Sequence, residues 1–163
     1  MNLLFLNDLI DRMGNEMNIL KMDQKDLKNL ICRMDMEDKF PMICHEYTED
    51  SNFEVNINDS IFLNDNLHRG TWIVGMNDDE IIFICNLNTY GTRLDIDTFE
   101  VNKDYRGDGL GGNILATIES VAEHYYDEIS ASPFDTDAGT FWIHMDYLEW
   151  RDGHLIKPLN KEI

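Results

Sequence analysis

Basic residues are scarce in this chain of 163 residues. Lysine and arginine together number 13 against 32 aspartates and glutamates, which gives a formal net charge of −19. Such a charge repels nucleic acid phosphates and anionic membranes, so direct binding to either is not expected. The acidity favours a cationic partner, such as a basic protein, a polyamine or an aminoglycoside-like amine, or it serves solubility alone.

Long apolar runs and the usual patterns of disulfide, metal and nucleophile sites are also absent. The start M-N-L-L-F-L-N-D is too short for a membrane span and lacks the basic leader of a signal peptide. The three cysteines form no C-x-x-C pair, which favours reduced thiols and a cytoplasmic setting. No serine stands in a G-x-S-x-G elbow. The scattered histidines have no metal-ligand spacing; they are His45, His68, His124, His144 and His154. We therefore expect one domain over residues 1–163 with no metal.

The most informative segment of the chain is a glycine-rich turn between a strand-like run and a helix-like run. It reads V-N-K-D-Y-R-G-D-G-L-G-G-N-I-L over residues 101–115. Glycines allow positive φ and close approach, so backbone N–H groups and the first turn of the next helix can converge on a phosphate. The helix is expected to start near Gly111, with an apolar stripe that comprises Ile114, Leu115, Ile118, Val121, Ala122 and Tyr125.

The strand before this turn changes its apolar parity. Leu94 and Ile96 alternate in one phase, whereas Phe99 and Val101 alternate in the other. One extra residue, a β-bulge near Asp97 and Thr98, would return all four side chains to one buried face.

Two common nucleotide-binding templates do not account for the turn. No lysine follows the glycines, as a P-loop requires. Gly107, Gly109 and Gly112 match G-x-G-x-x-G, but a dinucleotide site needs a βαβ unit, and antiparallel hairpins are predicted upstream.

The segment R-G-D-G-L-G at residues 106–111 resembles the R/Q-x-x-G-x-G/A signature of the GCN5-related N-acetyltransferases, with the family's valine at Val101. A later segment, D-T-D-A-G-T-F-W-I-H-M-D-Y at residues 135–147, is a degraded match to a second family motif. The likeness covers roughly residues 71–158. It implies an α/β domain with a mixed, mostly antiparallel central sheet and helices on both faces. Residues 71–158 would form the acetyl-CoA-binding core, and residues 1–67 the variable region that shapes the acceptor pocket.

The resemblance also implies how acetyl-CoA would bind. The backbone of residues 106–112 would hold the pyrophosphate, and the edge of the strand at residues 99–101 would pair with the pantetheine arm. The cofactor-binding candidates are thus Phe99, Glu100, Val101, Arg106, Gly107, Asp108, Gly109, Leu110, Gly111 and Gly112. Asp108 departs from the family, because a carboxylate pointing at a pyrophosphate would weaken binding unless it points outward.

Acyl transfer to an amine needs a base for the ammonium and benefits from an acid near the leaving thiolate. Asp95 is the preferred base, with Asp97 and Glu100 in reserve, since two neighbouring carboxylates raise one another's pKa. Trp142 occupies the position of the family's tyrosine, and an indole N–H donates a hydrogen bond but does not titrate near neutral pH. Tyr147 is a candidate substitute, as are His144, Tyr125 and Tyr126.

The expected function is therefore N-acetyl transfer from acetyl-CoA to an amine of a cationic small molecule or a basic protein. Two alternatives stay open. The chain could bind acyl-CoA with little or no turnover, or it could be an acidic inhibitor of a basic or DNA-binding protein.

Periodicity predicts the remaining elements. Helices are expected over residues 3–13 and from the N-cap Asp23 to Phe40-Pro41, and short strands at 42–47 and 53–57. Hairpins are expected over residues 71–87 and 147–157, with a strand at 128–132.

Overall fold

The computed structural model describes residues 1–44, 70–133 and 136–159, with side chains omitted at 136–138. The strand expected at 53–57, most of that at 42–47, and His45, His68 and Asp135 lie outside these ranges. Residues 42–44 form a turn, so the prediction of a strand there is wrong.

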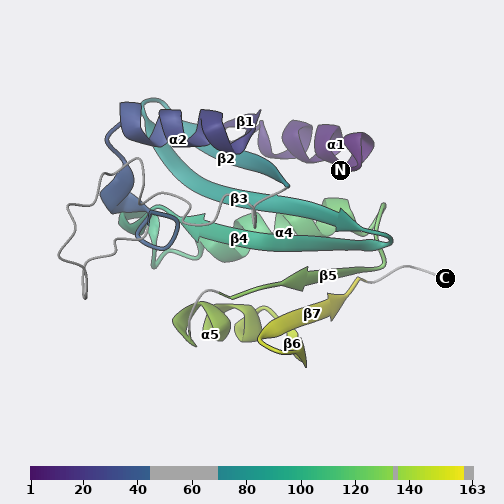
Figure 1. The fold of residues 1–163 in the computed structure, drawn as a ribbon. Helices are drawn as coiled ribbons and strands as arrows, with labels where there is room; N and C mark the ends of the chain where they lie inside the picture. The colour runs from purple at the N-terminus through teal and green to yellow at the C-terminus, as the bar shows by residue number, and fades with distance from the viewer. Residues whose placement is uncertain (45–69, 134–135, 160–163) are drawn as a thin grey trace.

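The described residues form a seven-stranded sheet in the order β1-β2-β3-β4-β5-β7-β6 (Figure 1). Neighbouring strands are antiparallel except β4 and β5, which are parallel. The strands are β1 (Asn18–Met22), β2 (Thr71–Asn77), β3 (Glu80–Tyr90), β4 (Arg93–Val101), β5 (Glu128–Ala131), β6 (Leu148–Arg151) and β7 (His154–Pro158). The expected mixed, mostly antiparallel sheet and both hairpins are confirmed.

Helices cover both faces of the sheet, as expected. On one face, α1 (Leu3–Met13) and α4 (Leu110–Ala122) pack on β3, β4 and β5 through a large apolar cluster. On the other, α2 (Gln24–Arg33) packs on β2 and β3. Figure 1 shows α4 behind β3 and β4, and α5 (Thr136–His144) beside the β6–β7 hairpin. Among the described residues, no helix is long and apolar enough to cross a membrane.

The first two helices begin where their caps predict. Asn2 accepts the backbone N–H groups of Leu4 and Phe5, and Asp23 accepts that of Asp26 at 2.8 Å. The second helix was expected to reach Phe40-Pro41 but ends at Arg33. Asp35 has a φ of 55°, which stops an α-helix, and a short 3-10 turn (Glu37–Lys39) follows.

The sequence did not reveal β1, which pairs with β2 at the edge of the sheet from Asn18 opposite Met76 to Met22 opposite Trp72. Its five residues, N-I-L-K-M, carry too short an alternation to stand out.

The β-bulge on β4 is confirmed. Thr98 lies opposite Asn86, whereas Ile96 lies opposite Leu87, so Asp97 is the extra residue. The bulge places Leu94, Ile96 and Val101 in the same buried cluster despite their change of parity. Beyond the bulge, β4 no longer pairs with β5, because their last pair is Ile96 with Ala131.

Candidate functional site

The glycine turn builds a helix N-terminus with free backbone donors. The chain leaves β4 at Val101, passes through a short 3-10 turn (Lys103–Tyr105), and enters α4 at Leu110, one residue before the expected start. Gly107 and Gly109 have φ values of 99° and 79°, a region that favours glycine. Gly109 is the N-cap and offers no side chain, so the first N–H groups of α4 remain available to an anion.

The turn opens onto a cavity of about 720 Å³ between α4, α5 and the end of β4. Its lining contains most of the predicted cofactor-binding residues: Phe99, Glu100, Val101, Arg106, Gly107, Gly109, Leu110, Gly111 and Gly112, together with Trp142. Asp108 is exposed and is not part of this lining. Its carboxylate therefore does not point into the cavity, where it would repel a bound anion. Asp95, Asp97 and Tyr147 also lie outside the lining.

The edge of β4 that faces this cavity has free backbone groups. The N–H of Asn102 donates to the carbonyl of Ile82 on β3 at 2.8 Å. In an antiparallel pair, the backbone N–H and C=O groups of successive residues point alternately toward and away from the partner strand. The backbone groups of Glu100 therefore also point toward β3, while those of Phe99 and Val101 point away from it. The Val101 carbonyl accepts the Nε–H of Arg106 at 2.9 Å. In the described residues no strand pairs with this edge beyond Ile96.

Glu100 is a buried anchor rather than an open base. Its carboxylate accepts the backbone N–H groups of Met42 and Ile43 at 3.0 and 2.8 Å and pairs with Arg106 at 2.9 Å. Burial raises the pKa of the Glu100 carboxyl, while these N–H groups and the guanidinium oppose the rise. The contacts bring Pro41 and Met42 into the cavity lining. No sequence motif pointed to these two residues.

Trp142 lies in an aromatic cluster on the cavity wall. It is 4% exposed, and its ring contacts those of Phe99, Phe141 and Tyr147 at centroid distances of 5.9, 5.4 and 4.8 Å. Trp142 is also one of the residues that line the cavity.

Tyr147 is placed behind this wall. It is fully buried, and its hydroxyl donates to Glu119 at 2.8 Å, which also pairs with Lys157 at 3.1 Å. Burial, followed by the Glu119 carboxylate, raises the pKa of the Tyr147 hydroxyl. These contacts give Tyr147 a role in packing α4 against α5 and β7. Tyr125 and Tyr126 lie near the C-terminal end of α4, where both rings pack on Phe5 of α1.

Asp95 lies on the sheet face opposite α4. Its neighbours Leu94 and Ile96 join the α4 cluster, so alternation turns Asp95 to the other face, where it accepts the Ser130 hydroxyl at 2.7 Å. Burial raises the pKa of Asp95. The Ser130 hydrogen bond lowers it in part, and the negative charge of Asp97 raises it further. Asp97 is half-buried in the bulge.

The cavity fits the arm and phosphates of acetyl-CoA. It joins a helix N-terminus and positive-φ glycines, which suit a pyrophosphate, to an unpaired strand edge, which suits the amides of pantetheine. A Cβ at Gly107 or Gly109 would meet no atom within 4 Å, so the space above these glycines is open.

Comparison with solved structures finds many acetyltransferases of the same fold. A ribosomal-protein-S18-alanine N-acetyltransferase from Escherichia coli aligns over 89% of this chain and 95% of its own, with a TM-score of 0.56 at 13% identity. A GNAT-family acetyltransferase from Staphylococcus aureus aligns over 88% and 99%, with a TM-score of 0.55 at 15% identity. One from Streptococcus pneumoniae aligns over 89% and 100%, with a TM-score of 0.52 at 12% identity.

No family model and no curated protein matches the sequence. At these identities the structures establish architecture rather than substrate. The strand order, the bulged fourth strand, the glycine turn and these alignments together show that the chain has the fold of the GCN5-related N-acetyltransferases.

Proposed function

We propose that this protein transfers an acetyl group from acetyl-CoA to an amine. The observation that carries the proposal is the opening of the glycine turn and the free β4 edge onto one cavity. The N–H groups at the start of α4 would hold the pyrophosphate, and the backbone of Phe99 and Val101 would pair with the pantetheine amides. Bound acetyl-CoA supplies an activated acetyl group on sulfur.

Beyond the pair of Ile96 with Ala131, β4 and β5 no longer pair, and we call this region the gap. The residues around the gap would take part in the reaction. Beyond the bulge, backbone N–H groups of β4 are free to donate to negative charge that develops on the acetyl oxygen. Trp142 would donate its indole N–H to the sulfur or to a nearby carbonyl without giving up its proton. Of the two buried carboxylates, Asp95 is less constrained than Glu100, because it accepts one serine hydroxyl, whereas three donors hold Glu100.

A cationic acceptor is supported by the net charge of −19, which raises the encounter rate of polyamines, aminoglycosides and basic peptides. The thiol released from acetyl-CoA can be measured with spermidine, an aminoglycoside and a lysine-containing peptide as acceptors. Turnover with any of them above the rate without amine supports the proposal. Tight acetyl-CoA binding without thiol release from any amine favours an acyl-CoA-binding protein, a reading that the indole at position 142 motivates.

An acidic inhibitor of a basic protein is the remaining alternative. It requires neither the cavity nor the free β4 edge, so it predicts no acetyl-CoA binding at all.

A further inference from the structure

The imidazole of His154 contacts Ser132 at the end of β5, at the level of the bulge on β4. Ala131, the last residue of β5, pairs with Ile96 on β4 and with Leu155 on β7. Ser132 and His154 lie one step beyond these pairs, at the level of the bulge residue Asp97. The Ser132 hydroxyl and His154 Nδ1 are 2.8 Å apart. Because adjacent strands are about 4.8 Å apart, the His154 backbone lies about 10 Å from β4 and its ring can extend toward the gap.

His154 projects from the same face as Asp95. Ile129, Ala131 and Leu155 point into the α4 cluster, so alternation directs Ser130, Ser132 and His154 to the opposite face. His154 and Asp95 are close enough to interact electrostatically. His154 is exposed and lines a second cavity of about 920 Å³ between α5 and the β6–β7 hairpin, together with Pro133 and Trp150. An amine that enters this cavity can reach the ring.

A buried donor on this face has no partner. Asn86 lies opposite Thr98, beside the bulge, and is fully buried. Its amide oxygen accepts from Asn88 at 2.9 Å, but its amide nitrogen has no partner among the described residues. Buried donors are nearly always paired, so an unpaired one beside the gap is consistent with a ligand oxygen that completes it.

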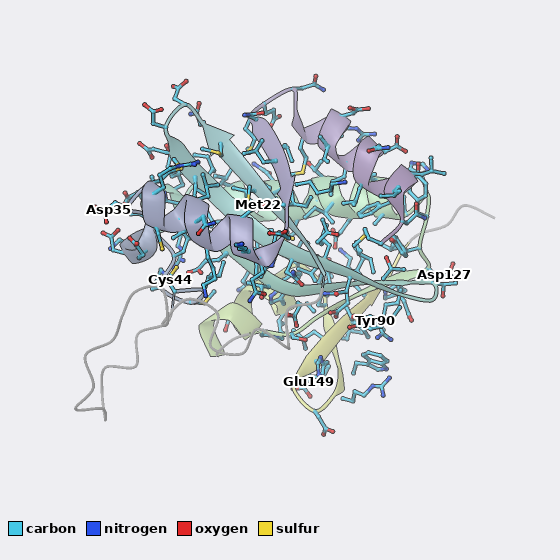
Figure 2. The ribbon with its side chains drawn as sticks, turned by 45° about the horizontal axis from the view of Figure 1, so that its top comes forward. Met22, Asp35, Cys44, Tyr90, Asp127 and Glu149 are labelled. Atoms are coloured by element: carbon cyan, nitrogen blue, oxygen red, sulfur yellow. The ribbon has the colours of Figure 1, made fainter. Side chains whose placement is uncertain are left out.

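The hairpin that carries His154 is tied to the rest of the sheet. The Arg93 guanidinium of β4 lies 4.5 Å from the centre of the Trp150 ring on β6, and the Arg151 guanidinium lies 3.9 Å from the same centre. Figure 2 shows Tyr90 on the same side of the molecule as Glu149 of this hairpin, and the Arg93 guanidinium also lies over the Tyr90 ring. These contacts fix the position of His154 relative to β4.

We propose that His154 is the general base for the acceptor amine, a catalytic role that rests on the proposed acetyl transfer. Ser132 holds Nδ1, which leaves Nε2 to take a proton from the ammonium, directly or through one water. The amine nitrogen then bonds to the acetyl carbon, and the carbon–sulfur bond breaks with its electron pair on sulfur. The imidazolium returns its proton to solvent, to which it is exposed.

The charges around His154 divide by element. From β4, Asp95 interacts with His154, and Asp97 and Arg93 act in turn on Asp95. The hairpin residues Glu149, Arg151 and Asp152 and His144 of α5 line the same cavity as His154. Asp95 is the positioning partner, since its carboxylate lies on the same face of the sheet and interacts electrostatically with the ring. The sequence did not single out His154, because its partners come from strands that are distant along the chain.

The test is chemical rescue of His154→Ala. The variant is assayed by thiol release from acetyl-CoA with the best of the three amines, from pH 5.5 to 9, with and without added imidazole. His124→Ala is the matched control, since His124 is an exposed histidine beyond α4. His154→Ala is expected to lower kcat/KM by about 10²–10⁴-fold. Added imidazole should restore part of the rate in His154→Ala and leave His124→Ala unchanged.

Three outcomes overturn the proposal. His154→Ala could keep the wild-type kcat/KM and pH profile. Its loss of rate could be restored by His154→Gln but not by imidazole, which shows a structural role. The wild type could release no thiol with any amine, in which case the proposed function fails as well. Equal stabilisation of wild type and His154→Ala by acetyl-CoA shows that the fold and the cofactor cavity are intact.

Discussion

At the scale of single residues, one substitution within the family pattern changes the expected chemistry. An indole N–H at position 142 can stabilise a leaving thiolate but cannot protonate it. We predict that Trp142→Phe lowers kcat by about 10–100-fold, the value of one hydrogen bond to a charged group. Trp142→Tyr should restore activity and add an alkaline limb to the pH profile of kcat.

The prediction for Trp142 can be checked without any acceptor. The chain has three tryptophans, and Trp142→Phe assigns one of their indole N–H resonances. That resonance should shift on addition of CoA, while those of Trp72, which packs beneath α2, and Trp150 stay in place. A resonance at position 142 that does not respond to CoA contradicts the role of Trp142.

Gly109 is predicted to be required for cofactor binding because of its φ of 79°. Gly109→Val should cost about 1–2 kcal/mol of folding free energy and abolish acetyl-CoA binding measured by isothermal titration. Gly91→Val is the matched control, since Gly91 has a φ of 61° in the turn between β3 and β4. It should lose similar stability and bind acetyl-CoA normally. Equal loss of binding in both variants contradicts a specific role for the glycine turn.

Asp95 gives a prediction about the pH dependence of stability. Burial raises its pKa above the ordinary 3.8, so the folded state favours the neutral carboxyl. Its contribution is fully present below pH 3.8 and is lost as pH rises through the raised pKa of the folded state. The unfolding free energy of Asp95→Asn relative to wild type, measured by urea denaturation, should therefore be higher at pH 7.5 than at pH 4. The same difference at both pH values contradicts the raised pKa.

At the scale of elements, the edge of β4 separates two kinds of backbone amide. Glu100 and Asn102 face β3, whereas Phe99 and Val101 face the cavity. Hydrogen exchange should be slow at Glu100 and Asn102 with or without acetyl-CoA. At Phe99 and Val101 it should be fast in the free protein and slow in the complex. Amides at 99 and 101 that are already protected in the free protein contradict a free edge.

The sequence predicted those elements whose cause is local. The bulge followed from apolar parity between Ile96 and Phe99, and the helix after the glycine turn followed from its stripe. The segment at Met42 and Ile43 could not be placed, because its N–H groups bind Glu100, 58 and 57 residues away. The end of the second helix was missed for a different reason. Its apolar spacing runs on to Met34, whereas the backbone turns at Asp35.

The candidate site divides in the same way. The proposed cofactor half lies on one continuous stretch, residues 99–112, which the motif predicted and most of which lines one cavity. The proposed acceptor half depends on pairs across strands, such as Asp95 with Ser130 and Ser132 with His154, which no linear pattern contains.

At the scale of the whole molecule, the net charge of −19 acts oppositely on the two proposed substrates. CoA is polyanionic, so the protein's field slows its approach, whereas the field attracts a polycationic amine. Raising the ionic strength from about 0.01 to 0.15 M shortens the Debye length from about 30 to 8 Å. The association rate of acetyl-CoA should then rise and that of spermidine should fall, as stopped-flow fluorescence can measure. The same sign of salt dependence for both contradicts this account.

The most direct test of the central claim is heat denaturation of the wild-type protein with and without acetyl-CoA. Binding to the folded state alone at a hundredfold excess over Kd adds about 2.7 kcal/mol. For a chain of this size the midpoint should rise by about 5–10 °C. Gly109→Val should show no such rise. An unchanged wild-type midpoint at millimolar acetyl-CoA would contradict a coenzyme site at the glycine turn.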